Sequence, residues 1–229
     1  ATLVPTQQSL KSYVDSEVTI KDGQLWYKDS VIDNSLARRI IKMWKEGHDF
    51  SAMLNFLKNL QLNSSSRAVN ELYRFLDAND LPITADGHFL AYKNVNNNYK
   101  DKHSGTFNNE IGQVCEMERN SVDDNPNNTC STGLHFCSLE YLKGFWGTSG
   151  HTMIIKINPM DVVSIPVDYD NSKGRCCRYV VVDEHERAKE GIEAFDSSVW
   201  NQYLEAYDEG YDDGFENGLS FQAGEERDI

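Results

Sequence analysis

The stretch LDANDLPITADGHFLAYKNV, residues 76–95, contains the boundary that decides the fold. Before Leu81-Pro82 the apolar residues recur at the three- and four-residue spacing of amphipathic helices. Beyond it, Asp86-Gly87 is a turn signal, and Phe89–Val95 has the apolar and aromatic character of a strand. The sequence therefore predicts helices before Pro82 and a sheet after it.

Three helices are expected upstream of this boundary, and each has end signals. They run from Asn34 or Ser35 to Gly47, through Phe50–Leu57, and from a cap within Ser64–Ser66 to about Asn79. Further upstream, Glu17–Tyr27 alternates around Asp22-Gly23, which predicts a β-hairpin. Residues 1–15 form a polar lead-in without a clear period.

Short strands dominate the chain downstream of Pro82. They are expected at Leu134–Cys137, Met153–Ile157, Val162–Ile165 and Arg175–Val182, with a short helix at Leu139–Phe145 and a polar loop at Glu116–Asn128. The fold class is α+β: an N-terminal hairpin plus a three-helix unit, a mixed and mostly antiparallel sheet domain, and a C-terminal helix. The expected modules are a lead-in at 1–15, a hairpin and helical module at 16–80, a sheet domain at 81–185, and an acidic tail at 186–229.

Composition limits the classes of partner. The 229 residues carry a formal net charge of −14, which repels nucleic acid and anionic membrane surfaces. No apolar run reaches the length of a transmembrane helix, and the first residues lack the pattern of a secretory signal. Five cysteines without a secretion signal predict reduced thiols in a cytoplasmic compartment. We expect no nucleic-acid partner and no membrane-spanning segment.

The segment Cys130–Cys137 is the densest cluster of chemically reactive residue types. His135 and Cys137 share one face of the expected strand, and Cys130 with His103 or Cys115 could complete a zinc site. No Cys-x2-Cys pair supports zinc, and no phosphate loop, nucleotide fingerprint or nucleophile elbow is present. The preferred interpretation is a half-buried strand with His135 hydrogen-bonded, no metal, no cofactor and no assigned catalytic residue.

The tail repeats aromatic and small residues at four-residue spacing, which predicts a helix with a glycine face beside an aromatic stripe. Three glycines disfavour a helix unless another backbone approaches closely. One interpretation is a docking helix for another chain; the alternatives are a helix folded back on its own domain and a disordered tail. The candidate partner-binding residues are Tyr207, Gly210, Tyr211, Gly214, Phe215 and Gly218.

Several collinear motifs resemble the rIIB lysis-inhibition protein family of T-even bacteriophages, over about residues 13–184. They are Ala78–Asp80, Ile83–Gly87, Phe89–Lys93, His103–Phe107, Cys130–Ser138, Asp161–Pro166, Asp168-Tyr169 and Arg175–Val182. The resemblance implies a role in phage control of lysis timing and in escape from host or prophage exclusion. It also implies a companion rIIA protein and association with the host inner membrane. No catalytic residues come with it.

A shorter resemblance concerns the strand Gly133–Ser138 and the helix after it. ADP-ribosyltransferase-like folds carry a similar strand in their nucleotide cleft. This resemblance implies a cleft lined by Tyr92, His135 and Tyr141, with Glu184 or Glu186 as the acid.

Three functions therefore compete. The first is a non-enzymatic phage accessory protein that binds another phage or host protein, such as an rIIA-like companion, or a second copy of itself. It would act in the host cytoplasm with at most peripheral contact with the inner membrane. A virion-associated structural role and an NAD- or nucleotide-binding enzyme are the alternatives.

Overall fold

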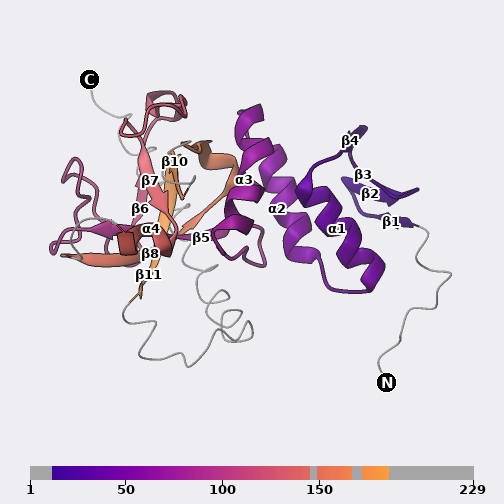
Figure 1. Ribbon diagram of the computed structural model, residues 1–229, viewed down its shortest axis with the longest axis horizontal. Coiled ribbons are helices and arrows are strands. Elements are labelled where there is room, and N and C mark those ends of the chain that lie inside the picture. The colour runs from indigo at the N-terminus through magenta and orange to yellow at the C-terminus, as the bar shows by residue number, and fades with distance from the viewer. Residues whose placement is uncertain (1–11, 145–148, 167–171, 186–229) are drawn as a thin grey trace, which may run out of the picture.

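Three helices lie between two antiparallel sheets in the computed structural model of the chain, which describes residues 12–144, 149–166 and 172–185. Figure 1 shows the smaller sheet at the N-terminal end, the helices in the middle and the larger sheet beyond them. The predicted α+β class is confirmed. The predicted C-terminal helix lies outside the described residues.

The smaller sheet is a meander of four strands, β1 (Ser12–Val14), β2 (Val18–Lys21), β3 (Gln24–Tyr27) and β4 (Ser30–Ile32), paired in chain order. The predicted hairpin is confirmed, because Lys21 pairs with Gln24 across Asp22 and Gly23, which have φ angles of 51° and 77°. Two consecutive positive φ values are the geometry that an Asp-Gly turn favours. The sequence did not indicate β1, which forms the end of the expected lead-in.

The three predicted helices are confirmed as α1 (Ser35–Glu46), α2 (Ser51–Gln61) and α3 (Ser66–Ala78). The side chain of Asn34 caps α1 by accepting a hydrogen bond from the Ala37 N–H, and Ser65 caps α3 in the same way through Ala68. Gly47 ends α1 in the left-handed conformation. These end signals act through local backbone geometry, so the helix ends could be predicted from the sequence alone.

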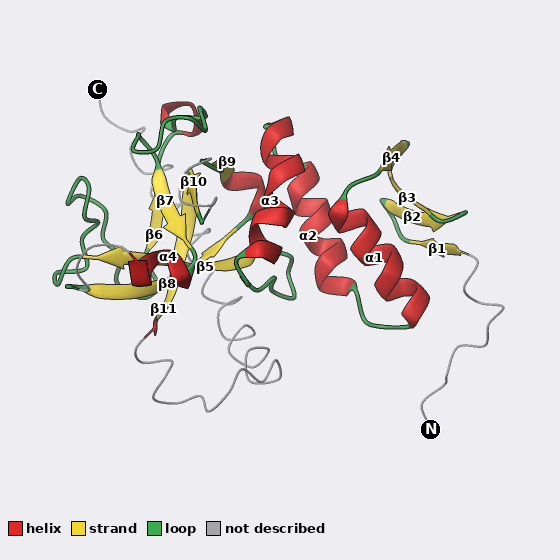
Figure 2. Cartoon of the chain, viewed as in Figure 1, coloured by secondary structure: helices red, strands yellow, loops and turns green. Residues whose placement is uncertain are grey.

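The larger sheet has seven strands in the order β6-β11-β8-β5-β7-β10-β9, and every described pair is antiparallel. Figure 2 shows strands of this sheet in yellow beyond α3. Its strands are β5 (Phe89–Val95), β6 (Val114–Glu116), β7 (Leu134–Cys137), β8 (His151–Ile157), β9 (Val162–Ser164), β10 (Lys173–Cys176) and β11 (Arg178–Glu184). Short helices connect some of them: η2 (Arg119–Ser121), α4 (Leu139–Gly144) and η3 (Pro159–Asp161).

One predicted strand was wrong: Arg175–Val182 is divided between β10 and β11. The Cys177 N–H donates to the Asp161 carbonyl at 3.0 Å, and the Cys177 carbonyl accepts from Met117 at 2.9 Å. The chain thereby leaves β7 and β9 and pairs instead with β8 and β6. Continuous β-propensity along the sequence does not reveal such a change of partners. Strand β6 was also missed, at the start of the expected loop.

The turn between α3 and β5 joins the helices to the larger sheet. The side-chain amides of Asn55 and Asn59 on α2 donate to the carbonyls of Ala85 and Asp86, at 2.8 Å and 3.0 Å. A single hydrophobic cluster includes buried residues of both sheets and all three of these helices. The separation into modules near residue 80 stays a prediction.

A buried ionic cluster stabilises the same turn. The ammonium nitrogen of Lys156, on β8 and only 1 % exposed, lies 2.7 Å from a carboxylate oxygen of Asp86. The same oxygen lies 2.8 Å from Nδ1 of His88, and the other accepts from the Thr84 hydroxyl. Burial alone would raise the pKa of Asp86, but His88, Lys156 and Thr84 hold it well below its usual range.

No helix in the described ranges is both long and apolar enough to cross a membrane.

Candidate functional site

A hollow of the larger sheet lies where β5 and β7 separate. These strands pair at only one position, Tyr92 with Cys137. Beyond it, the loops 101–107 and 129–133 and helix α4 enclose a hollow of about 470 Å³, within the roughly 300–1,000 Å³ typical of small-molecule sites. Its apolar wall comes from Phe107, Met117, Leu134, Phe136, Tyr141 and Leu142.

The charged part of the lining is predominantly basic, although the chain as a whole is acidic. Among the described residues, three lysines, Lys93, Lys102 and Lys173, line the hollow against a single carboxylate, Asp101. His103 and His135 line it as well. The hollow is therefore a local positive region in a chain of formal net charge −14.

His135 lies on the wall of the hollow as a half-buried side chain. No hydrogen bond joins its ring nitrogens to any of the described residues, contrary to the sequence-based expectation. Burial, followed by the positive charges of Lys93, Arg175 and Lys173, lowers the pKa of His135 to about 4. At neutral pH its ring is therefore uncharged, with one nitrogen able to donate a hydrogen bond and the other to accept one.

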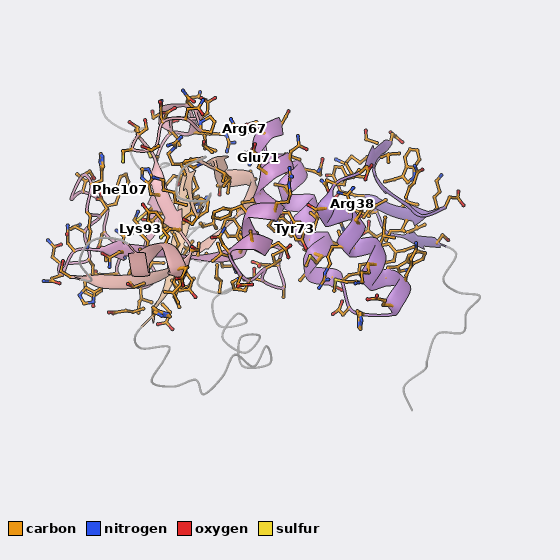
Figure 3. All side chains as sticks on the ribbon, in the orientation of Figure 1. Arg38, Arg67, Glu71, Tyr73, Lys93 and Phe107 are labelled. Carbon is orange, nitrogen blue, oxygen red and sulfur yellow. The ribbon has the colours of Figure 1, made fainter. Side chains whose placement is uncertain are left out.

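Lys93, on the central strand β5, lines the hollow together with Phe107, and both residues are labelled in Figure 3. Its ammonium donates to the His135 carbonyl at 2.9 Å and lies 5.5 Å from the centre of the Tyr179 ring. Burial lowers its pKa. Within the described part of the chain, no carboxylate lies within ion-pair distance of this ammonium, although the side chain is half-buried on the core-facing side of β5.

Asp101 does not form an ion pair with Lys93, because its carboxylate is turned into its own loop. It accepts hydrogen bonds from the backbone N–H groups of Ser104, Thr106 and Phe107, at 2.6, 2.9 and 2.9 Å, and from the Ser104 hydroxyl. Burial would raise its pKa, yet these bonds and the charge of Lys93 hold it below the usual value. Asp101 therefore shapes the 101–107 wall as an anion that is already hydrogen-bonded.

Two cationic side chains of β10 donate hydrogen bonds to the loop 123–129, which lies before β7. The Lys173 ammonium donates to the Thr129 carbonyl at 2.8 Å and lies 5.9 Å from the centre of the Tyr141 ring. Arg175 is fully buried and donates to the carbonyls of Asp123, Asn125 and Asn128, at 2.8, 2.7 and 2.6 Å. One guanidinium thus fixes most of the loop that leads into β7.

The candidate cleft residues do not all converge on this hollow. His135 and Tyr141 line it, whereas Tyr92 packs with Leu90 and Ile154 in a second hydrophobic cluster. Glu184 lies elsewhere, with its carboxylate 2.6 Å from Nδ1 of His151. Glu186, the other candidate acid, lies outside the described residues.

The candidate zinc residues are only partly brought together. Cys130, His103, His135 and Cys137 line the hollow, while Cys115 lies apart, with its thiol donating to the Asn108 carbonyl at 3.2 Å. Among the described residues, no three His, Cys, Asp or Glu side chains form a group that could hold a metal ion. Burial raises the pKa of Cys137 to about 12, so its thiol stays protonated and is a poor nucleophile.

Sequence reasoning missed the basic character of the hollow. Lys93 shares its strand face with Phe89, Ala91 and Val95, all buried in the main hydrophobic cluster. A lysine at a core-facing position was the signal that could have revealed it. Lys173 had no such signal, because the predicted strand began only at Arg175, after the first residues of β10.

The candidate partner-binding residues of the tail, Tyr207, Gly210, Tyr211, Gly214, Phe215 and Gly218, lie outside the described residues. Their role stays a prediction.

The fold and the hollow together define an α+β protein with a basic, ligand-sized recess in an antiparallel sheet. The profile of the family described as "Bacteriophage T4 protein rIIB" matches residues 8–206. "Protein rIIB" of Enterobacteria phage T4 is 40 % identical over 181 residues, which cover 79 % of this chain and 58 % of that protein. The chain belongs to the rIIB family of bacteriophage proteins and spans somewhat over half the length of this relative. No solved structure matches it significantly.

Proposed function

We propose that this rIIB-family protein acts by binding another protein, and that this interaction controls the timing of host lysis. The observation that carries the proposal is a row of side chains across the outer face of the smaller sheet, apolar except for one threonine. Val14 pairs with Thr19, Thr19 with Trp26, and Trp26 with Val31, so the four side chains form one line over β1–β4. We call this line the outer row.

The outer row is open to solvent at both ends. Val14 is 69 % exposed and Val31 42 % exposed, and they lie on the two edge strands. Trp26 is half-buried between them, with the Lys21 ammonium 5.2 Å from its ring centre. Its indole N–H has no hydrogen-bond acceptor among the described residues. An exposed apolar row with a central tryptophan is typical of protein interfaces.

The chemistry of the row favours a protein partner over a small ligand. Burying a large apolar side chain completely stabilises an interface by about 1.5–3 kcal/mol, and tryptophan is enriched among the residues that dominate binding energy. The partner that family resemblance suggests is a companion phage protein of the rIIA type, met in the host cytoplasm at the inner membrane. A second copy of this chain is the alternative occupant.

The test uses lysine substitutions on the outer row and a matched control. Val14→Lys and Val31→Lys place charge in the proposed interface, whereas Leu62→Lys places the same charge at a 60 % exposed leucine just after α2. We expect both valine variants, but not Leu62→Lys, to lose co-purification with a co-expressed rIIA-type protein. We also expect them to change lysis timing when they replace the wild-type gene in the phage.

Lysis timing and co-purification that are unaffected in both valine variants would refute the outer row as the interface. Sedimentation of the purified chain distinguishes the two occupants, because a self-associating row would give a dimer that both valine variants dissociate.

A further inference from the structure

We infer that the hollow between β5 and β7 binds a small organic anion with an aromatic body. The inference concerns a site separate from the outer row and does not depend on the identity of a protein partner. It rests on the size of the hollow, the kinds of residue that line it, and two polar groups that the described residues leave incompletely satisfied.

The first of these groups is the ammonium of Lys93. It belongs to a half-buried side chain, donates one hydrogen bond to the His135 carbonyl and has no carboxylate within ion-pair distance among the described residues. A partly desolvated cation without a counter-ion is costly, and an anion placed beside it would recover part of that cost. Asp101, the one carboxylate of the lining, is occupied by its own loop.

The second group is the imidazole of His135. Its ring nitrogens make no hydrogen bond to the described residues, although the ring lies on the wall of the hollow. A neutral imidazole offers one donor and one acceptor. It therefore suits a ligand that carries both a polar substituent and an anionic group.

The apolar part of the lining indicates that the uncharged part of the ligand is aromatic. Phe107, Phe136 and Tyr141 present aromatic rings, and Met117, Leu134 and Leu142 complete an apolar lining. Aromatic side chains favour stacked or edge-on contact with a flat ring. A purely inorganic anion would leave this surface uncovered, whereas an aromatic carboxylate or a nucleoside phosphate would cover it and place its charge near Lys93.

The experiment compares two fluorescent probes that differ in charge. One is 1-anilinonaphthalene-8-sulfonate, an aromatic anion, and the other is N-phenyl-1-naphthylamine, its neutral counterpart. Both are titrated into the purified full-length chain under conditions in which circular dichroism shows it folded. We expect the anion to bind one-to-one and about ten-fold or more tightly than the neutral probe. Equal affinity of the two probes would overturn the inference.

Variants locate the bound probe. Lys93→Met removes the positive charge on the wall of the hollow, and Leu142→Trp fills the hollow from α4. Each should weaken binding of the anion by about ten-fold or more. Lys42→Met removes an exposed lysine from α1 and should leave binding unchanged. A folded Leu142→Trp protein that binds like the wild type would show that the probe lies elsewhere and would refute the site.

A second measurement is independent of the stability of any variant. In the wild-type protein, saturation with the anion should shift the imidazole nitrogen resonances of His135, and an unchanged spectrum would refute the site. Competition experiments then identify the chemical class of the natural ligand. Displacement by adenosine 5′-monophosphate supports a nucleotide, displacement by indole-3-carboxylate supports an aromatic acid, and failure of both at millimolar concentration would overturn the inference.

Discussion

A Cβ atom on Gly87 would lie 2.2 Å from the backbone carbonyl carbon of Asn55 and 2.3 Å from the backbone nitrogen of Phe56. The turn before β5 thus rests directly on the backbone of α2, and the close approach requires glycine. Gly87 also has a φ angle of +79°, which disfavours other residues.

Gly87→Ala should destabilise the protein through both effects. The left-handed conformation costs about 1–2 kcal/mol, and forcing the turn away from α2 should add about 1–3 kcal/mol. Gly23→Ala is the matched control, because its φ angle is +77° and nothing lies within 4 Å of the added carbon. Urea unfolding of the two variants should separate strain from clash. Equal losses of free energy would show that the contact with α2 is unimportant.

Asp86→Asn should be strongly destabilising, because it removes a negative charge from beside the buried Lys156 ammonium. Breaking a buried ion pair from one side costs about 3–5 kcal/mol. The double variant Asp86→Asn/Lys156→Met removes both charges and should regain part of that loss in chemical denaturation. No recovery would mean that Lys156 is stabilised mainly by groups other than Asp86.

The same ion pair predicts a loss of stability in acid. Because the folded state holds the pKa of Asp86 below its unfolded value of 3.8, the stabilisation is complete above that pH and declines as the pH falls below it. Asp86→Asn should therefore have a flatter stability profile below about pH 4 than the wild type. Parallel profiles would contradict the assignment.

Arg175→Lys should loosen the loop 123–128, although it preserves the charge. A lysine ammonium cannot reproduce the planar geometry with which the guanidinium reaches three carbonyls. We expect faster proteolytic cleavage within residues 123–132 and a loss of about 2–4 kcal/mol in unfolding free energy. Arg38→Lys, at an exposed position on α1, is the control and should cleave like the wild type. Unchanged cleavage in Arg175→Lys would show that the guanidinium of Arg175 does not hold this loop in place.

His135 should remain neutral down to mildly acidic pH. Its pKa of about 4 in the folded protein lies below the ordinary value of 6.5. The unfolded chain therefore binds more protons in this interval, so the contribution of His135 is complete above pH 6.5 and lost as the pH falls towards 4. Its size is at most roughly 3 kcal/mol. Nuclear magnetic resonance titration checks the value, and a midpoint near 6.5 would contradict it.

The sequence predicted local features far better than the site. Asn34, Ser65 and Gly47 act on their own helix ends, and the Asp22-Gly23 turn fixes its own hairpin, so neighbouring residues suffice to recognise them. The hollow depends on the separation of β5 from β7, which follows from pairings between distant segments. For the same reason Tyr92 and Glu184 were grouped with His135 on the basis of resemblance, although the structure places them elsewhere.

The order of strands in the larger sheet sets when it can form during synthesis. Strand β11 is the last described strand in the chain, yet it lies between β6 and β8, and β6 pairs with β11 alone. The meander and α1–α3 use neighbouring segments and can form while the ribosome is still translating the rest. A chain terminated before Arg178 would leave β8 with an open edge and β6 unpaired. Nonsense mutations late in the gene should therefore yield an aggregating fragment instead of a shortened functional protein.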